Sequence, residues 1–454
     1  MYKKLLLLLL LGLILVLVTM EIGVRIGKEE AITEMVAKEA AKAEMLAKEK
    51  ALAAIEKALA AKEKKLTIFN TNYHQADVSA INLEESARLF LKNEAIKLYG
   101  KVVSAQSMSN RISLLISDGK YLALNMSGEV IAYIDLFEYL PEFFVNKDIK
   151  NSASNPGWHP NIGISGGYWA SETDLMIYHL SEFKNSESDK SQWNPKNHFE
   201  MSLTWLQIKN EEVSFVDRHT FGHLTKEDIN ALGGGMSIFD SGILLATGST
   251  AIDFGTRSQD PLSNYGKLIW IDFEAVKTSR KFKDENFTIL AKGLRNPYGI
   301  VTSNGKGYIT DHGSSGGDNI SEIVPGGNFG RNLYDYGRPY DKNLPLYSNK
   351  PDNFIEPLYY FSPAIAPSDI SSCPFEDSLQ GYGNCLVVSS LRAQSMFILK
   401  IQRMGDLQTP YVQSIEQIKL GERIRSIETV GNTVFLLTDL LNLYVVNYSK
   451  NFTI

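Results

Sequence analysis

Hydrophobic residues occur in short runs over most of the chain, from about residue 70 to its end. Each run is rich in β-branched and aromatic residues and is bounded by turn-forming residues, as in GKLIWIDF (266–273), NCLVVSSL (384–391) and NTVFLLTDL (432–440). Such runs predict β-strands joined by turns. Apart from a short helical stretch near residues 83–100, no long helical period interrupts them. We therefore predict an all-β domain over residues 67–454. So many short strands favour a β-propeller over a single sandwich.

The first residues of the chain follow a different pattern. Lys3 and Lys4 precede a largely apolar run from Leu5 to Met20, which Glu21 ends. Lysines before an apolar helix place that end of the chain in the cytoplasm. We therefore predict that residues 1–24 form a transmembrane signal-anchor and that the following domain lies on the periplasmic or extracellular side. The run is a little shorter than the ~20 residues of a spanning helix, so a cleaved signal peptide remains the alternative.

A segment of strong helix formers separates this run from the β domain. Residues 25–66 consist mainly of Ala, Glu, Lys, Leu and Met, which favour a helix even without tertiary contacts. The segment predicts a helical spacer that holds the domain away from the membrane. Met45, Leu52, Leu59 and Leu66 repeat with the spacing of a heptad, so the alternative is a coiled coil that makes a homo-oligomer through residues 28–66.

Charge and cysteine content exclude several classes of protein. The net charge is −6 and no basic patch stands out in the β domain, which argues against a nucleic-acid partner. The two cysteines, Cys373 and Cys385, form no CxxC pair, which argues against a zinc or thioredoxin-type site. They are either one disulfide in an oxidising compartment or two buried thiols.

Four groups of segments in the second half carry the candidate chemistry: GLRNPYGI (293–300), DHGSSGGDNISEIVPGGNFG (311–330), PAIAPSDI (363–370) with LVVSSLRAQSMFIL (386–399), and ERIRSI (422–427) with FLLTD (435–439). Their order and spacing resemble the glucose/sorbosone dehydrogenase family, over roughly residues 150–450. The resemblance implies a six-bladed propeller. It also implies oxidation of a sugar with pyrroloquinoline quinone (PQQ) and calcium, the cofactors of soluble enzymes in that family.

Five residues match positions that contact the quinone in that family: Arg295, Asn296, Arg392, Arg423 and Arg425. Their chemistry suits the role, because guanidinium groups bind carboxylates through paired donors and the quinone carries three carboxylates. Arg423 and Arg425 are two positions apart, so on a strand they point the same way and need an anion between them. Without the resemblance, the simpler interpretation is that Arg295 pairs with a nearby acid, and the alternative for Arg423 and Arg425 is a surface pair.

The resemblance also assigns a calcium loop. In the family the ion is bound largely by backbone carbonyls, at positions that match Gly313 and Ser314, within a run that ends at Phe329. Glycines let carbonyl groups converge on such an ion. The family commonly has proline where Ser314 stands, and a carbonyl ligand survives that change. A structural turn remains the alternative.

The expected catalytic base is missing. The family uses a histidine just before a Gly-Gly strand start to accept the substrate's hydroxyl proton, and the matching position here is Ala231. His223 and His159 are the nearest substitutes, and neither fits the pattern. No catalytic residue is therefore assigned.

Two hypotheses follow. The protein oxidises a sugar or related alcohol outside the cytoplasm, with a respiratory electron acceptor. Alternatively, it is a non-catalytic propeller that serves as a membrane-tethered binding or scaffolding module.

Overall fold

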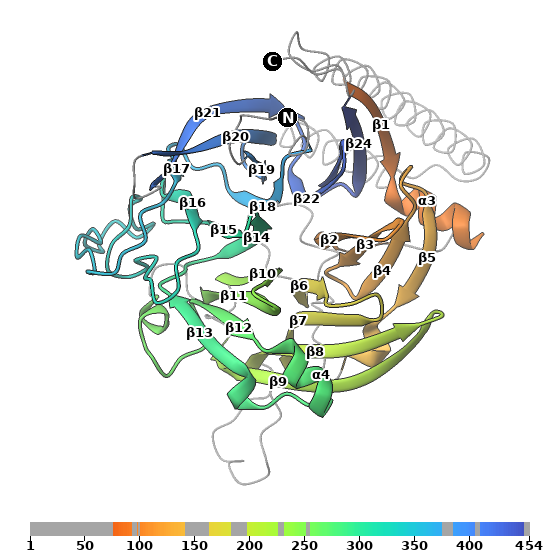
Figure 1. Cartoon of the computed structure of the whole chain (residues 1–454), viewed down its shortest axis with the longest axis horizontal. Coiled ribbons are helices and arrows are strands. Elements are labelled where there is room, and N and C mark those ends of the chain that lie inside the picture. Colours follow the sequence, from red (N-terminus) through yellow and green to blue (C-terminus); the bar gives the residue numbers. More distant parts are fainter. Residues whose placement is uncertain are drawn as a thin grey trace, which may run out of the picture. The chain divides into compact units, whose positions relative to one another are not determined.

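The computed structural model describes residues 76–92, 98, 100–140, 163–182, 198–225, 231–250, 255–374, 385–404 and 409–448. They form six four-stranded antiparallel sheets arranged around a central axis (Figure 1). The prediction of an all-β, six-bladed β-propeller is confirmed. The predicted anchor, spacer and coiled coil lie outside these residues. Within them, no helix has the length and apolar character needed to cross a membrane.

Each blade runs outward from an innermost strand that lines the axis. The first three blades are β2 (Val102–Met108), β3 (Arg111–Ile116), β4 (Lys120–Leu124), β5 (Val130–Asp135); β6 (Ile164–Trp169), β7 (Asp174–Glu182), β8 (His198–Lys209), β9 (Glu212–Thr225); and β10 (Ala231–Phe239), β11 (Gly242–Thr250), β12 (Lys267–Ile271), β13 (Phe287–Lys292).

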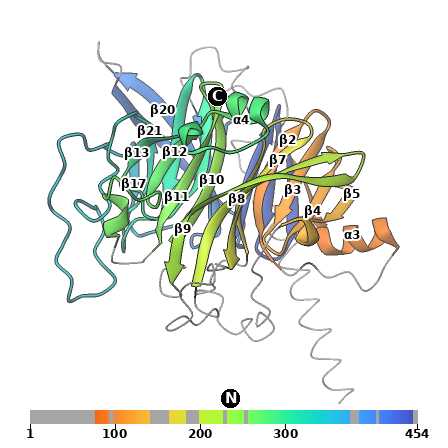
Figure 2. The same ribbon diagram turned by 90° about the horizontal axis from the view of Figure 1, so that it is seen from below.

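The remaining blades are β14 (Pro297–Ser303), β15 (Lys306–Asp311), β16 (Asp318–Glu322), β17 (Tyr359–Phe361); β18 (Pro367–Ser372), β19 (Cys385–Ser390), β20 (Ser395–Met404), β21 (Thr409–Lys419); and β22 (Ile424–Val430), β23 (Thr433–Thr438), β24 (Asn442–Tyr448) with β1 (Ala76–Asn82). Two short α-helices, α3 (Leu83–Leu91) and α4 (Phe273–Ser279), lie outside the sheets, and Figure 2 shows α3 at the side of the propeller.

The sixth blade joins the two ends of the domain. Strand β1 pairs antiparallel with β24, from Ala76 opposite Tyr448 to Asn82 opposite Asn442. The blade that ends the chain thereby receives its outermost strand from residues that precede the first blade. This pairing closes the ring of sheets. The last blade is built from both ends of the domain, so it does not appear as one continuous unit in the sequence.

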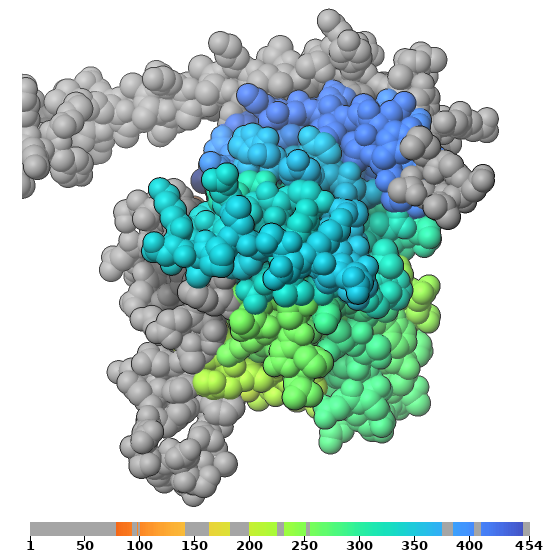
Figure 3. All heavy atoms as spheres, turned by 90° about the vertical axis from the view of Figure 1, so that its left-hand side faces the viewer, coloured from red at the N-terminus to blue at the C-terminus, as the bar shows by residue number. Residues whose placement is uncertain are grey.

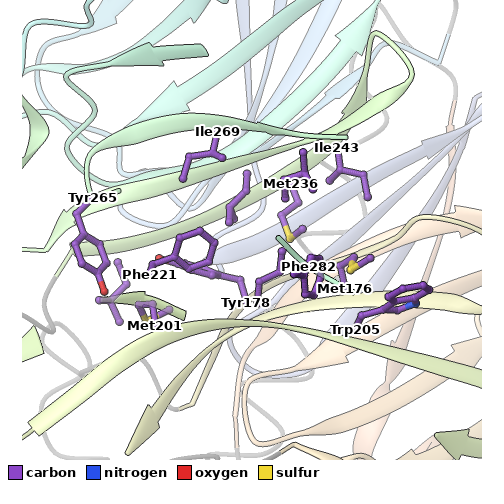
Figure 4. Packing of buried hydrophobic residues seen from close by; sticks show 14 of the residues in the cluster. Met176, Tyr178, Met201, Trp205, Phe221, Met236, Ile243, Tyr265, Ile269 and Phe282 are labelled. Atoms are coloured by element: carbon purple, nitrogen blue, oxygen red, sulfur yellow. The ribbon is translucent and has the colours of Figure 1, made fainter. Parts of the chain in front are cut away.

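Apolar side chains fill the spaces between neighbouring blades. In the largest cluster, Tyr178 and Trp205 of the second blade pack towards Ile243 and Ile269 of the third (Figure 4). Trp205 is completely buried, and its edge meets Phe273 of α4 with 5.9 Å between ring centroids. Alternate residues of each strand therefore face opposite neighbouring blades, which is why both faces of most strands are hydrophobic.

The strand order brings separated parts of the sequence to one end of the axis. The innermost strands begin there, and the connections between the second and third strands of each blade lie beside those beginnings. Asp439, after β23, donates its N–H to the carbonyl of Arg423 (2.9 Å), and His312, after β15, donates to that of Asn296 (3.2 Å). We call this end of the axis the mouth.

One long connection covers part of the molecule beside the mouth. Residues 323–358 join β16 to β17 and form much of the cyan surface in Figure 3. Further along the chain, Cys373 and Cys385 form a disulfide with their Cα atoms 5.4 Å apart. The alternative of two buried thiols is therefore wrong.

Candidate functional site

Two predicted arginines bind one carboxylate at the mouth. Arg423 donates from Nε to Asp439 Oδ2 (2.7 Å), and Arg425 donates from Nε to Oδ1 (2.8 Å) and from Nη2 to Oδ2 (3.2 Å). Burial alone would raise the pKa of Asp439, but Arg425, with Lys101 and Arg423, holds it at about 2. The two guanidiniums do lie on the same side of the chain. The anion between them is a residue of the protein, Asp439, which the sequence reasoning did not assign to them.

A third cation, Lys101, lies directly before β2. Burial, together with the nearby guanidiniums of Arg425 and Arg423, lowers its pKa to about 8, while Asp439 opposes this shift. Lys101 and Arg425 both line the axial cavity described below. Asp439 therefore faces three cations, Arg423, Arg425 and Lys101. Nothing in the sequence motifs indicated Lys101, which belongs to the first blade.

Arg295 is held rigidly beside these cations. Its side chain is buried, donates from Nη1 to the carbonyl of His312 (3.0 Å) and lies 5.5 Å from the ring centroid of Tyr340. Asp311 fixes the backbone here by accepting the N–H groups of Arg295 (2.9 Å) and Asn296 (2.6 Å). Asn296 in turn accepts the N–H of Gly233 through Oδ1 (3.2 Å), which ties β14 to β10.

Three of the predicted arginines lie close enough to His312 for their charges to act on it. Its Nε2 lies 2.8 Å from the carbonyl oxygen of Pro367, and its ring meets the ring of Tyr298 edge-on at 5.1 Å. Burial lowers the pKa of His312 to about 3, and the positive charges of Arg295, Arg425 and Arg423 contribute to that shift. Three guanidiniums from two blades therefore act on one neutral imidazole.

Arg392 occupies the same end of the propeller without joining this cluster. Its backbone N–H donates to the carbonyl of Ile365 (2.9 Å), next to the start of β18. The side chain is exposed to solvent, and Arg392 is not among the charges that act on His312. The structure thus brings together four of the five predicted cofactor residues.

The predicted calcium loop is filled by its own contacts. Ser314 is completely buried, and its carbonyl accepts the N–H of Gly317 (2.8 Å) while its N–H donates to Asp335 (3.1 Å). Phe329 donates its N–H to the carbonyl of Lys292 (2.8 Å). An ion that takes six to eight oxygens needs an open cradle, and Gly313 and Ser314 form a packed turn instead. The described residues also contain no group of three or more Asp, Glu, His or Cys side chains that could hold a metal.

The two histidines that the sequence offered are not shown at the position of Ala231. Ala231 is buried at the start of β10, opposite Thr250. His223 is exposed on β9, the outermost strand of the second blade, where its carbonyl accepts a hydrogen bond from Arg257 (3.4 Å). His159 lies outside the described residues. The structure therefore leaves the catalytic base unassigned among the histidines that the sequence offered.

Below the mouth, a cavity of about 310 Å³ lies on the axis. All six innermost strands line it, and Asp369 of β18 and Glu428 of β22 are its carboxyl groups. Asp369 accepts hydrogen bonds from Ser426 Oγ (2.6 Å), the Ile427 N–H (3.1 Å) and the Ile370 N–H (2.9 Å). Glu428 accepts the N–H of Ser107 through Oε1 (2.8 Å).

Burial raises the pKa of Asp369 to about 6 and that of Glu428 to about 7, where the charge of Asp369 adds to the effect. Sequence reasoning missed both acids. The sequence did contain a signal for them, because each is an acidic residue inside a strand-like run, PSDISS for Asp369 and IRSIETV for Glu428.

These features define a class of protein: a six-bladed propeller that carries a cluster of cations at its axial mouth and two half-buried acids in its axial cavity. The family model for glucose/sorbosone dehydrogenase matches residues 188–443, more than half of the chain. The chain belongs to this family.

Relatives and solved structures agree with this fold. The uncharacterized protein slr1608 of Synechocystis sp. (strain ATCC 27184 / PCC 6803 / Kazusa) is 30% identical over 199 residues, which cover 41% of this chain and 46% of the relative, less than half of its length. The apo-form soluble aldose sugar dehydrogenase of Escherichia coli has a TM-score of 0.53 at 14% identity, covering 82% of this chain and 99% of that one. A glucose dehydrogenase structure has a TM-score of 0.57 at 14% identity, covering 82% and 100%.

Proposed function

We propose that the protein oxidises a sugar or related alcohol on the extracytoplasmic side of a membrane, with a bound quinone as the oxidant. The observation that carries this proposal is the convergence of Arg295, Arg423 and Arg425 on His312, with Lys101 beside them. Only one carboxylate, Asp439, is paired directly with Arg423 and Arg425. Because Lys101 also acts on Asp439, three cations surround this one carboxylate, an arrangement that suits a polyanionic ligand.

The donor set fits PQQ. Arg423 uses only Nε on Asp439, and Arg425 uses Nε and Nη2. The remaining guanidinium nitrogens can therefore donate to ligand carboxylates, together with Lys101. When bound, the quinone supplies an acceptor for the hydride that leaves the alcohol carbon. The residues of this chain hold and orient it. Calcium has no comparable support, because Ser314 is packed inside a closed turn.

The disulfide supports the proposed side of the membrane. Disulfides persist in oxidising compartments such as the periplasm, and Cys373 and Cys385 form one. The predicted anchor in residues 1–24 would leave the propeller in that compartment. If the anchor is uncleaved, the protein should remain in the membrane fraction after alkaline carbonate washing, and release by that wash would contradict the prediction.

The second candidate function is a propeller that binds without catalysis. The specific observation that favours it is Ala231, whose buried methyl group cannot accept a proton. Under this alternative the cationic mouth binds an anionic ligand and no oxidation follows.

Titration with PQQ distinguishes the two candidate functions, in which the mouth binds a ligand, from the case in which the mouth binds none. We expect the purified full chain to bind PQQ, measured by the absorbance of the bound quinone, and Arg423→Ala with Arg425→Ala to abolish binding. Arg88→Ala on α3 removes a positive charge away from the mouth and should leave binding unchanged. Dye reduction with aldoses then tests turnover. Binding without turnover favours the second candidate, and absence of binding contradicts both.

A further inference from the structure

A buried arginine, Arg331, lies against the loop in which the sequence predicted calcium ligands. Arg331 is only 3% exposed, and its Nη1 donates to the hydroxyl oxygen of Ser314 (3.3 Å). The N–H of Ser314 donates to Asp335 Oδ2 (3.1 Å), and its carbonyl accepts the N–H of Gly317 (2.8 Å). All three polar groups of Ser314 thus have partners within the protein. A proline at position 314 would offer neither the N–H nor the hydroxyl, so the serine and the arginine belong to one arrangement.

The protein fixes the position of Arg331 from several sides. Its N–H donates to the carbonyl of Gly293 (2.9 Å), and its own carbonyl accepts hydrogen bonds from Ser258 Oγ (3.1 Å) and Gln259 Nε2 (2.8 Å). Gly255 leaves room for the side chain, because a methyl group there would lie 2.5 Å from Arg331 Nε. The guanidinium therefore occupies a place that the surrounding loops are built to hold.

Two guanidiniums and two carboxyl groups line a small space at this turn. Arg295 and Arg331 contribute the positive charges, Asp311 and Asp335 the negative charges, and Gly313 is part of the same wall. The formal charges of these four side chains cancel. The space measures about 20 Å³, which holds about one water molecule. A divalent cation placed there would meet two positive charges at short range.

The charge of Arg331 is a permanent one. Burial and the charge of Arg295 lower its pKa, while Tyr347, Asp335 and Asp311 oppose that shift. A guanidinium remains protonated under all conditions in which a protein is folded. The ring of Tyr347 adds a favourable cation–π contact, with its centroid 5.5 Å from Arg331 Cζ. Asp311 and Asp335 therefore face a positive charge that needs no bound ion.

We propose that the guanidinium of Arg331 is a built-in cation, which supplies at this turn the positive charge that a metal ion would otherwise supply. The loop at Gly313 and Ser314 is then ordered without calcium. Arg331 is a positioning residue, because Arg295 and Asp311 at the mouth line the same space. The proposal goes beyond the proposed function and does not depend on it, since it concerns the order of the loop and not the ligand at the mouth.

Thermal unfolding of the full chain in detergent, with EGTA or with excess CaCl₂, tests this proposal. We expect both conditions to give the unmodified protein the same melting temperature. Arg331→Met keeps an unbranched side chain without the charge. It should melt lower in EGTA, and CaCl₂ should raise its melting temperature by about 2 °C or more, because two acids then share one guanidinium.

Two variants separate the charge of Arg331 from its packing. Arg331→Lys keeps the positive charge, so its melting temperature should not respond to CaCl₂. Arg338→Met removes an exposed arginine from the same connection and should behave like the unmodified protein. MgCl₂ at equal concentration controls for ionic strength.

Several results would contradict a built-in cation. A saturable rise of the melting temperature with CaCl₂ in the unmodified protein would show that the chain itself holds calcium. If Arg331→Met is less stable and indifferent to CaCl₂, the arginine acts through packing alone. If Arg331→Met does not fold in EGTA, circular dichroism measures its refolding on addition of CaCl₂, and absence of refolding overturns the proposal. Quinone is absent from these assays, so their failure is distinguishable from failure of the proposed function.

Discussion

Glu428 should make the folded protein less stable as the pH rises from about 5 to about 8. The ordinary pKa of this carboxyl group is 4.5, and burial in the axial cavity raises it to about 7. Between these values the unfolded chain has lost the proton while the folded chain keeps it. Stability falls with pH wherever the folded state binds more protons.

The size of the effect follows from the two pKa values. Below pH 4.5 Glu428 is protonated in both the folded and the unfolded state, so it does not lower the free energy of unfolding. Above pH 7 Glu428 is ionised in both states, and the free energy of unfolding is lowered by the full cost of holding this charge in the cavity. A pKa raised from 4.5 to about 7 corresponds to up to about 3 kcal/mol. Glu428→Gln retains an oxygen for the Ser107 N–H and cannot ionise, so it should remove most of this dependence.

Urea denaturation at pH 5, 6, 7 and 8 measures the difference. The free energy of unfolding of Glu428→Gln, relative to the unmodified protein, should rise steadily across this range and level off near pH 8. Glu212→Gln changes an exposed acid and should give a curve parallel to that of the unmodified protein. Parallel curves for Glu428→Gln as well would refute the reasoning, because the carboxyl group would then be as well solvated in the folded protein as in the unfolded chain.

Three further changes test other parts of the structure. Trp205→Ala empties the core between the second and third blades, where Trp205 is completely buried, and should lower the free energy of unfolding in urea by about 3–5 kcal/mol. Cys373→Ser opens the disulfide loop and should cost roughly 3 kcal/mol in the same assay, an effect that dithiothreitol should reproduce in the unmodified protein. Asp439→Asn leaves Arg423 and Arg425 without their carboxylate; it should destabilise the fold by about 1–3 kcal/mol, and added sulfate should restore part of this loss. No recovery with sulfate would contradict a cationic mouth.

Much of the fold could be predicted from local patterns. Alternating and continuous hydrophobic runs gave the strands, and LEESARLFL, noted as helical, is α3. The short helix α4 (Phe273–Ser279) was missed because only seven residues carry its pattern. The number of blades came from the family resemblance, since the sequence contains no clear repeat.

Only those features of the candidate site that lie within a single sequence motif could be predicted. Arg423 and Arg425 were expected to point the same way, and both reach Asp439. Asp439 stood in the quoted segment FLLTD, but its role depends on the turn that places it beside Arg423. The contact between Ser107 and Glu428 joins residues 321 positions apart. These residues meet only because the first and sixth blades become neighbours when the ring closes, which no local pattern can reveal.

The mouth and the axial cavity are continuous, because Lys101 and Arg425 belong to both. Arg425 and Glu428 are three residues apart on β22, roughly 10 Å along an extended chain. Arg425 acts on Lys101, His312 and Asp439, yet no cation contributes to the pKa of Glu428 or of Asp369. An anion bound at the mouth would therefore act more strongly on the pKa of His312 than on that of Glu428.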